Sequence, residues 1–148
     1  MAAGGSVESD PPAPVGDYAA SCVGRERILA YFSQALGIRV SLLRLNYACE
    51  LRYGVLVDLA RKVLAGETID LSMGHFNVIW QADANGLALQ ALAHASSPPL
   101  VLNVTGPEIL SVRRVCEQFG DLLGKPVSFR GKEAPAAVAA PAAPPGPA

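Results

Sequence analysis

The sequence predicts an α/β fold, because segments with helical spacing of apolar residues alternate with short apolar runs typical of buried strands. The chain has 148 residues, of which 51% are hydrophobic and 17% charged, a composition typical of a globular domain with a core. We expect one folded unit over residues 15–132. Residues 1–14 are expected to be flexible, and the Ala/Pro-rich tail 133–148 is expected to be disordered.

The first half of the folded part predicts a helix, a strand and a second helix. Apolar residues recur with helical spacing over Val23–Leu36, and Gly37 follows as a C-terminal stop. The mostly apolar run Arg39–Leu45 predicts a buried strand. Val55–Ala65 is again helical in its spacing and is followed by a glycine.

The second half continues the alternation. Short strands are expected at Thr68–Leu71 and Phe76–Trp80, after which Asp83 is a candidate N-cap for a helix that runs through His94. Leu100–Val104 is the clearest strand pattern in the sequence.

The last elements surround a candidate helix cap. Ser111 is placed to cap a helix that ends at Gly124, and Val127–Phe129 is expected to form a final strand. Asn103 lies within the preceding strand, where its side chain is expected to satisfy local backbone groups.

Charge and cysteine content exclude several classes of function. The formal net charge is −1, with 12 basic and 13 acidic residues, so no nucleic-acid or membrane-surface partner is expected. No apolar run approaches the roughly 20 residues of a membrane span, and the N-terminus lacks a signal-peptide pattern, so we expect a cytoplasmic protein. The three cysteines form no C-x-x-C pair and there are two histidines, so neither a disulfide framework nor a metal site is expected.

One short motif contains side chains of the types that take part in catalysis. Tyr18, Cys22 and Arg25 lie at i, i+4 and i+7 of a predicted helix and therefore share one face, with Ser21 and Glu26 beside them. This spacing alone is also compatible with ordinary packing of a tyrosine near a helix start.

Several blocks in the same order resemble the extended short-chain dehydrogenase/reductases, the NAD-dependent epimerases and dehydratases of nucleotide sugars. Glu8–Tyr18 with Ser21, Cys22 and Glu26 is similar to the family's acidic residue, prolines and Tyr-x-x-Ser-Lys-x-x-x-Glu run. The further blocks that resemble the family over residues 6–130 are Leu43–Tyr47, Leu64–Ile69, Phe76–Asp83, Leu102–Glu108, Leu110–Ser111 and Leu123–Val127.

The resemblance implies a fold and a site. The fold would be the C-terminal portion of a Rossmann-like doubly wound sheet with a small α/β substrate-binding lobe. Tyr18 would be the general acid/base of an NAD(P)-dependent reaction, with Ser21 beside it and Cys22 at the position of the family's lysine.

The cysteine matters because a phenol has a pKa near 10 and needs a nearby cation to ionise at neutral pH. A unit charge at ~4 Å and an effective dielectric constant of ~20 supplies about 4 kcal/mol, on the order of three pKa units. A neutral Cys22 thiol supplies no such field, whereas Arg25, one turn further on, is a hypothetical substitute. Two interpretations of Cys22 stay open, functional decay and simple packing of a small side chain.

Arg44 and Asn46 are candidate substrate contacts by the same resemblance. The family usually has two residues between these positions and this chain has only Leu45, so the register differs. An asparagine at the end of a strand also commonly forms a turn.

No glycine-rich dinucleotide-binding turn occurs in the sequence. We therefore expect a nucleotide-sugar epimerase/dehydratase-like protein that lacks the dinucleotide-binding half, with NAD(P) binding by this chain in doubt and catalysis by it alone not expected. The alternative is a non-catalytic remnant or binding module for a sugar nucleotide or a partner subunit. A partial sheet would expose a strand edge, through which homo- or hetero-oligomers are expected.

Overall fold

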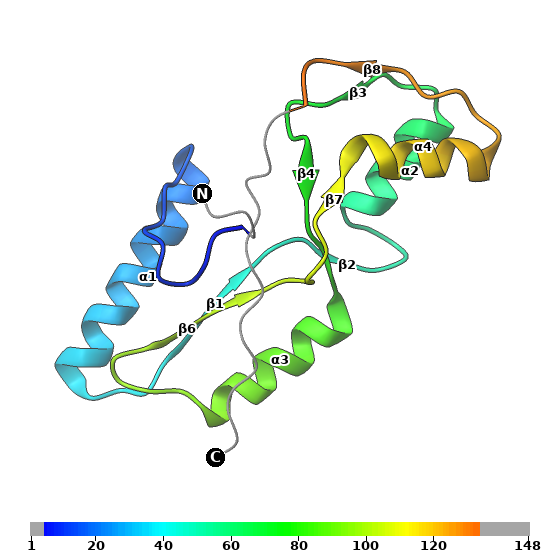
Figure 1. The fold of residues 1–148 in the computed structure, drawn as a ribbon. Coiled ribbons are helices and arrows are strands. Elements are labelled where there is room, and N and C mark those ends of the chain that lie inside the picture. The colour runs from blue at the N-terminus through cyan, green and yellow to red at the C-terminus, as the bar shows by residue number, and fades with distance from the viewer. Residues whose placement is uncertain (1–4, 134–148) are drawn as a thin grey trace.

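The computed structural model describes residues 5–133 and has mixed α/β architecture (Figure 1). Four helices and eight short strands alternate along this part of the chain. The helices are α1 Asp17–Leu36, α2 Val55–Leu64, α3 Gln81–Ala93 and α4 Val112–Leu123. The strands are β1 Ser41–Leu45, β2 Ala48–Cys49, β3 Ile69–Asp70, β4 His75–Phe76, β5 Ile79–Trp80, β6 Leu100–Val104, β7 Leu110–Ser111 and β8 Phe129–Arg130.

The longest pairing joins β1 and β6 in parallel. Ser41 lies opposite Leu100 and the register continues to Leu45 opposite Val104. Parallel strands need a long crossover connection, and here the connection contains β2, α2, β3, β4, β5 and α3. The β2–β5 and β3–β8 pairs are also parallel, whereas β4–β7 is antiparallel. The α/β prediction is therefore confirmed.

Helix ends follow the sequence signals where glycine or serine provides them. Gly37 and Gly124 end α1 and α4 in the left-handed conformation, which costs a residue without Cβ little. The Ser111 side chain accepts a hydrogen bond from the Arg114 amide, as expected of an N-cap. The predicted N-cap role of Asp83 is wrong, because α3 begins at Gln81 and Asp83 lies within its first turn.

Two clusters of buried side chains hold the elements together. In Figure 1, α2 and α4 lie side by side with β3 and β8 nearby. Their shared cluster is built from Leu59, Val63, Ile69, Leu71, Phe76, Val112, Val115 and Cys116. A smaller cluster of Ile79, Ala84 and Val104 packs β5, α3 and β6 together.

Helix α1 lies apart from these clusters, on one side of β1 and β6 (Figure 1). Ser33 is its only buried residue, and it holds the helix end by donating its hydroxyl to the Ile38 carbonyl at 2.7 Å. Tyr18, Ile28, Leu29, Tyr31, Phe32 and Leu36 are all exposed on α1. The prediction that Arg39–Leu45 forms a buried strand is wrong in part, because Leu43 and Leu45 are exposed and Leu42 is the buried residue of β1.

Two other strand predictions need correction. Phe76–Trp80, expected as one strand, forms parts of β4 and β5, which pair with β7 and β2 respectively. The short strand β7 was not predicted, because its two residues are too few to show any periodicity. No described helix has both the length and the apolar character that crossing a membrane would require.

Gly106, directly after β6, tests how closely the backbone there must approach the segment between β4 and β5. A Cβ at this position would overlap the Val78 carbonyl oxygen, whereas a Cβ at Gly86 on α3 meets nothing within 4 Å. We expect Gly106→Ala to lower the free energy of unfolding by about 3 kcal/mol through overpacking. Gly86→Ala should leave it unchanged or raise it by about 1 kcal/mol, because alanine favours the helix. Urea denaturation of both variants measures this; equal stabilities would contradict the close approach.

Candidate functional site

Polar residues come together at the carboxyl ends of the parallel strands β1 and β6, which lie at the same end of the sheet. This end of the sheet is called the polar edge. Asn46 follows β1 and donates its backbone N–H to the Val104 carbonyl at 3.0 Å. Its side-chain amide donates to the Asn77 side-chain oxygen, and the Asn77 amide in turn donates to the Gly106 carbonyl at 3.3 Å. Asn77 is 1% exposed, so this chain of hydrogen bonds orients the Asn46 side chain from within the fold. Ligands of open α/β sheets bind at this edge.

Two further features mark this edge. The Thr105 hydroxyl is buried and has no hydrogen-bond partner among the described residues. Buried polar groups are normally paired, so an unpaired one calls for an explanation. Tyr47 has φ 38°, in the left-handed region that a bulky residue rarely adopts. Such strained residues are concentrated at functional sites.

Tyr47 is held in this conformation by its ring contacts. Its hydroxyl donates to the Met73 sulfur at 3.3 Å, and its ring meets Phe76 edge to face with a centroid distance of 6.4 Å. The side chain is 40% exposed. The ring of Tyr47 therefore packs against Met73 and Phe76 near the end of β1 and stays partly exposed.

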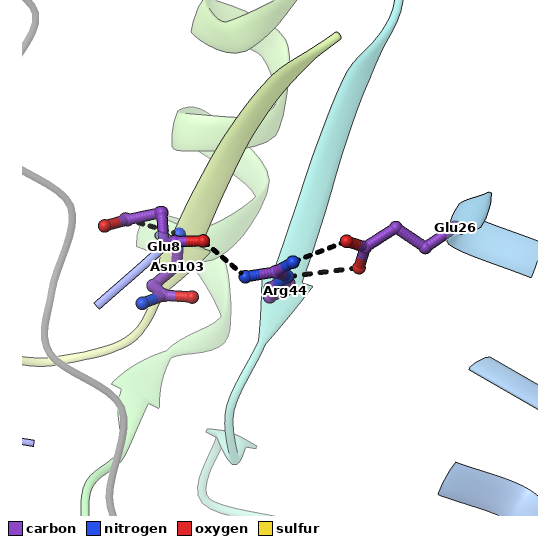
Figure 2. Close-up of polar contacts among 4 residues, drawn as sticks. All are labelled: Glu8, Glu26, Arg44 and Asn103. Atoms are coloured by element: carbon purple, nitrogen blue, oxygen red, sulfur yellow. Dashed lines mark hydrogen bonds and ion pairs between the residues drawn. The ribbon is translucent and has the colours of Figure 1, made fainter. Parts of the chain in front are cut away.

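Arg44 is the centre of an ion-pair network that ties α1 and the N-terminal segment to β1 (Figure 2). Its Nε donates to Glu26 Oε2 at 3.1 Å, and a second nitrogen donates to the other oxygen of the same carboxylate. A third nitrogen donates to the Glu8 carbonyl at 2.9 Å. The hydrogen bonds that Arg44 donates to Glu26, opposed by partial burial, raise the pKa of Arg44 above its ordinary value.

The other side of this network is Asn103, next to Arg44 across the β1–β6 pair (Figure 2). Its backbone N–H donates to the Glu8 carboxylate at 2.8 Å, and its side-chain amide donates to the Ser6 carbonyl at 3.1 Å. The expectation that Asn103 satisfies local backbone groups is therefore wrong, because its partners are more than 90 residues away in sequence. Residues 6–8 are tied to the sheet more closely than the composition of segment 1–14 predicts.

The predicted substrate contacts are thus brought close together, but their surroundings differ. Arg44 already has the Glu26 carboxylate as its counter-ion, so a ligand phosphate would have to compete with it. The Asn46 side chain is oriented by its hydrogen bond to Asn77, and Asn46 directly follows the last residue of β1. Their roles as substrate contacts stay predictions. The sequence analysis missed Asn77, Thr105 and Tyr47 as site residues. The signal that could have found the last two is their position within two residues of the end of β6 and of β1, respectively.

The Tyr18 motif lies on α1, where Tyr18 lines a cavity together with Arg44 and Leu45 of β1. Tyr18 is 84% exposed, and the Ser21 hydroxyl donates to the Tyr18 backbone carbonyl at 2.7 Å rather than to its phenol. Cys22 is half-buried, and Arg25 is exposed and forms no ion pair with the residues that the structure describes. Both side chains face an open cavity of about 620 Å³ between α1 and β1. Arg25 and Arg44 line the same cavity as Tyr18, and the catalytic role of Tyr18 stays a prediction.

The described residues do not fit a dinucleotide. A pyrophosphate needs successive glycine amides at a strand-to-helix turn. Among residues 5–133, α1 and α2 each begin after one isolated glycine, Gly16 and Gly54, which precede helices without any glycine-rich turn. The thiol of Cys22 also cannot hold a ribose hydroxyl as an ammonium group does. Within this same range no group of three or more metal-ligating side chains occurs.

Comparison with known proteins identifies the fold. The chain matches no family model and no curated protein sequence. Among solved structures it is similar to dTDP-glucose 4,6-dehydratase of Bacillus anthracis in complex with NAD, with TM-score 0.76 and 18% identity over 97% of this chain and 48% of that one. UDP-glucose 4-epimerase of Thermotoga maritima with UDP-glucose has a TM-score of 0.72 and 17% identity, over 91% of this chain and 47% of that chain. UDP-glucose 4-epimerase of Thermus thermophilus in complex with NAD has a TM-score of 0.68 and 22% identity, over 96% of this chain and 50% of that chain.

The chain therefore has the fold of one part of the sugar-nucleotide epimerases and dehydratases, and it spans about half the length of these solved structures. The predicted class, part of a Rossmann-like α/β fold, is confirmed. With sequence identities of 17–22%, the similarity to these solved structures is a similarity of fold alone.

The Arg44–Glu26 pair should stabilise the attachment of α1 to β1. Both side chains are about a quarter exposed, at 25% and 24%, so solvent screens the pair only in part. A double-mutant cycle with Arg44→Met and Glu26→Gln should give a coupling energy of about 1 kcal/mol in urea denaturation. The control cycle on Arg52 and Glu50, whose arginine is 82% exposed, should give none. Equal coupling in the two cycles would contradict the structural role of the network.

The three cysteines should differ sharply in reactivity. Burial raises the pKa of the Cys49 and Cys116 thiols, whereas Cys22 is half-buried beside an open cavity. We expect Cys22 to react with an aromatic disulfide reagent at least about ten times faster than the other two in the folded protein. Peptide mass mapping after timed quenching measures this. Protection of Cys22 equal to that of Cys116 would show that the cavity beside α1 is closed.

Proposed function

We propose that the chain binds a nucleotide sugar at the carboxyl ends of β1 and β6 and that it does not carry out NAD-dependent chemistry by itself. The observation that carries the proposal is the ordered polar edge of Asn46, Asn77 and Thr105, in a fold shared with enzymes solved with UDP-glucose or NAD. Its place in the sheet is where ligands of open α/β folds bind.

The described side chains suit the groups of such a ligand. A sugar presents hydroxyls that donate and accept hydrogen bonds, which an oriented Asn46 amide and the unpaired Thr105 hydroxyl can satisfy. The half-exposed ring of Tyr47 offers an apolar face for a sugar or base. The unpaired hydroxyl and the strained backbone are costs that a bound ligand would help to offset.

The absence of unaided catalysis follows from the α1 motif. A proton transfer by Tyr18 needs a stabilised phenolate, and the residue one turn away is a neutral thiol. Arg25 lies on the same helix face, three residues after Cys22. Its guanidinium is always charged, but it would have to extend back along the helix to reach the Tyr18 phenol. Nothing among the described residues would hold the hydride carrier. Binding without turnover is the function that these residues support best.

Binding is tested by titrating the full chain with UDP-glucose in a calorimeter. We expect saturable binding, and Asn46→Ala should weaken it at least about tenfold, or 1.4 kcal/mol. Asn85→Ala, on the exposed surface of α3, is the matched control and should bind as the parent does. NADH, followed by its fluorescence, should not bind. Saturable NADH binding, or no heat with UDP-glucose, would contradict the proposal.

Thr105→Val separates a ligand-binding hydroxyl from a structural one. Removing an unpaired buried hydroxyl without changing the shape of the side chain should raise the free energy of unfolding by about 1 kcal/mol. If the hydroxyl awaits a ligand, the same variant should bind UDP-glucose several-fold more weakly. Greater stability with unchanged affinity would place Thr105 outside the binding site.

A further inference from the structure

Met73 is held at a defined place in the loop between β3 and β4 (Figure 1). On one side of it, the Ser72 backbone N–H donates to the Asp70 carboxylate at 2.8 Å. On the other side, the Gly74 carbonyl accepts a hydrogen bond from the Val112 N–H at 3.0 Å. The Met73 side chain is 51% exposed, and it is the only methionine among residues 5–133. The loop therefore presents a thioether to solvent from a backbone that is held on both sides.

The sulfur of Met73 helps to hold the ring of Tyr47. The Tyr47 hydroxyl donates to this sulfur at 3.3 Å, and the ring meets Phe76 edge to face. Phe76 is buried, so it offers the ring an apolar contact from the core. The Tyr47 carbonyl accepts a hydrogen bond from the Ile79 N–H at 3.2 Å. Two contacts of the side chain and one of the backbone thus hold a residue whose φ is 38°.

Tyr47 links Met73 to the polar edge, because it directly follows Asn46. A left-handed backbone at a residue other than glycine costs about 1–3 kcal/mol and persists only where surrounding contacts enforce it. When the side-chain contacts of Tyr47 are lost, its backbone relaxes toward negative φ, and the peptide group that it shares with Asn46 rotates. The Asn46 side chain then loses the orientation that its hydrogen bond to Asn77 provides.

An exposed thioether is open to two-electron oxidation by hydrogen peroxide. A lone pair of the Met73 sulfur attacks one peroxide oxygen, so that an S–O bond forms and the O–O bond breaks. The second oxygen leaves as hydroxide and takes the proton of the transferred oxygen, which releases one water molecule. Sulfur is oxidised to the sulfoxide, and the peroxide is reduced. Methionine sulfoxide reductases return the sulfoxide to the thioether, so the modification is reversible.

Oxidation changes the contact with Tyr47. A thioether sulfur is a weak acceptor of hydrogen bonds, whereas a sulfoxide is polar and chiral. The new oxygen lies beyond the sulfur, so the Tyr47 hydroxyl must either move to follow it or lose the hydrogen bond. Either change draws the ring away from its present contact with Phe76. We propose that Met73 is a reversible oxidation site whose sulfoxide releases Tyr47 from its left-handed conformation and thereby weakens nucleotide-sugar binding at the polar edge. The last step rests on the proposed function.

The test treats the full chain with hydrogen peroxide and then with dithiothreitol, which reduces disulfides and sulfenic acids but not sulfoxides. Peptide mass mapping should find a sulfoxide at Met73, and nitrogen-15 NMR should show displaced amide resonances of Asn46 and Tyr47. The two sulfoxide reductases, one for each epimer, should return these resonances to their places. Met73→Leu keeps Met1 and all three cysteines, and peroxide should displace neither amide in it. An unmodified Met73, unmoved amides, or the same displacement in Met73→Leu would overturn the proposal.

Tyr47→Phe tests the route from the sulfur to the polar edge. This variant keeps the ring and removes the hydroxyl that meets the Met73 sulfur. Because the two changes act through one contact, oxidation should displace the Asn46 amide at most about half as far in this variant as in the parent. Equal displacement in the two chains would contradict the role of the Tyr47 hydroxyl.

Calorimetry with UDP-glucose tests the effect on binding. The oxidised parent should bind at least about fivefold more weakly than the reduced parent, whereas peroxide should not change the affinity of Met73→Leu. Displaced amides with unchanged affinity would overturn the effect on binding. A parent chain that binds no UDP-glucose in either form would contradict the proposed function, while the amide displacements would still decide whether Met73 controls Tyr47.

Discussion

The parallel pairing of β1 with β6 is the constraint on which the rest of the structure depends. It brings together two five-residue strands that are more than 50 residues apart in sequence. The closing of such a long connection costs conformational entropy, which the two buried clusters along the crossover offset. The same pairing places Asn46 beside Val104, and it therefore creates the polar edge to which we assign ligand binding.

The attachment of α1 has a different physical basis. Its contacts with the rest of the fold include few buried apolar side chains, and the Arg44–Glu26 pair and the hydrogen bonds of Ser33 hold it in place. Glu8 extends this network to Asn103 on the far edge of β6. A helix held by polar contacts over an open cavity leaves Tyr18 exposed.

Much of the fold could be predicted because local signals were strong. The glycines after α1 and α4 adopt a left-handed backbone at little cost, and Ser111 offers a hydroxyl to free amides, so both kinds of signal act within a single turn. The start of α3 was missed because Trp80 caps it without a side-chain hydrogen bond, so no residue type marks it. The exposure of Leu43 and Leu45 was missed because apolar composition does not show which edge of a strand is paired.

The candidate site was predicted less well than the fold. The pattern Tyr18, Ser21, Cys22 indicated a relationship, but its spacing could not show that the phenol is exposed. Arg44 and Asn46 were identified from the family resemblance, while Glu26 and Asn77, which determine their surroundings, are 18 and 31 residues away from them. Contacts over such separations depend on the tertiary fold.

The most direct test of the central claim is a nitrogen-15 NMR titration of the chain with UDP-glucose. Binding at the carboxyl ends of β1 and β6 predicts that the amide resonances of Asn46, Tyr47 and Thr105 shift together and saturate, while those of Tyr18 and Cys22 stay in place. Saturable shifts confined to α1, around Tyr18 and Cys22, would contradict the account and return the function of the chain to that helix.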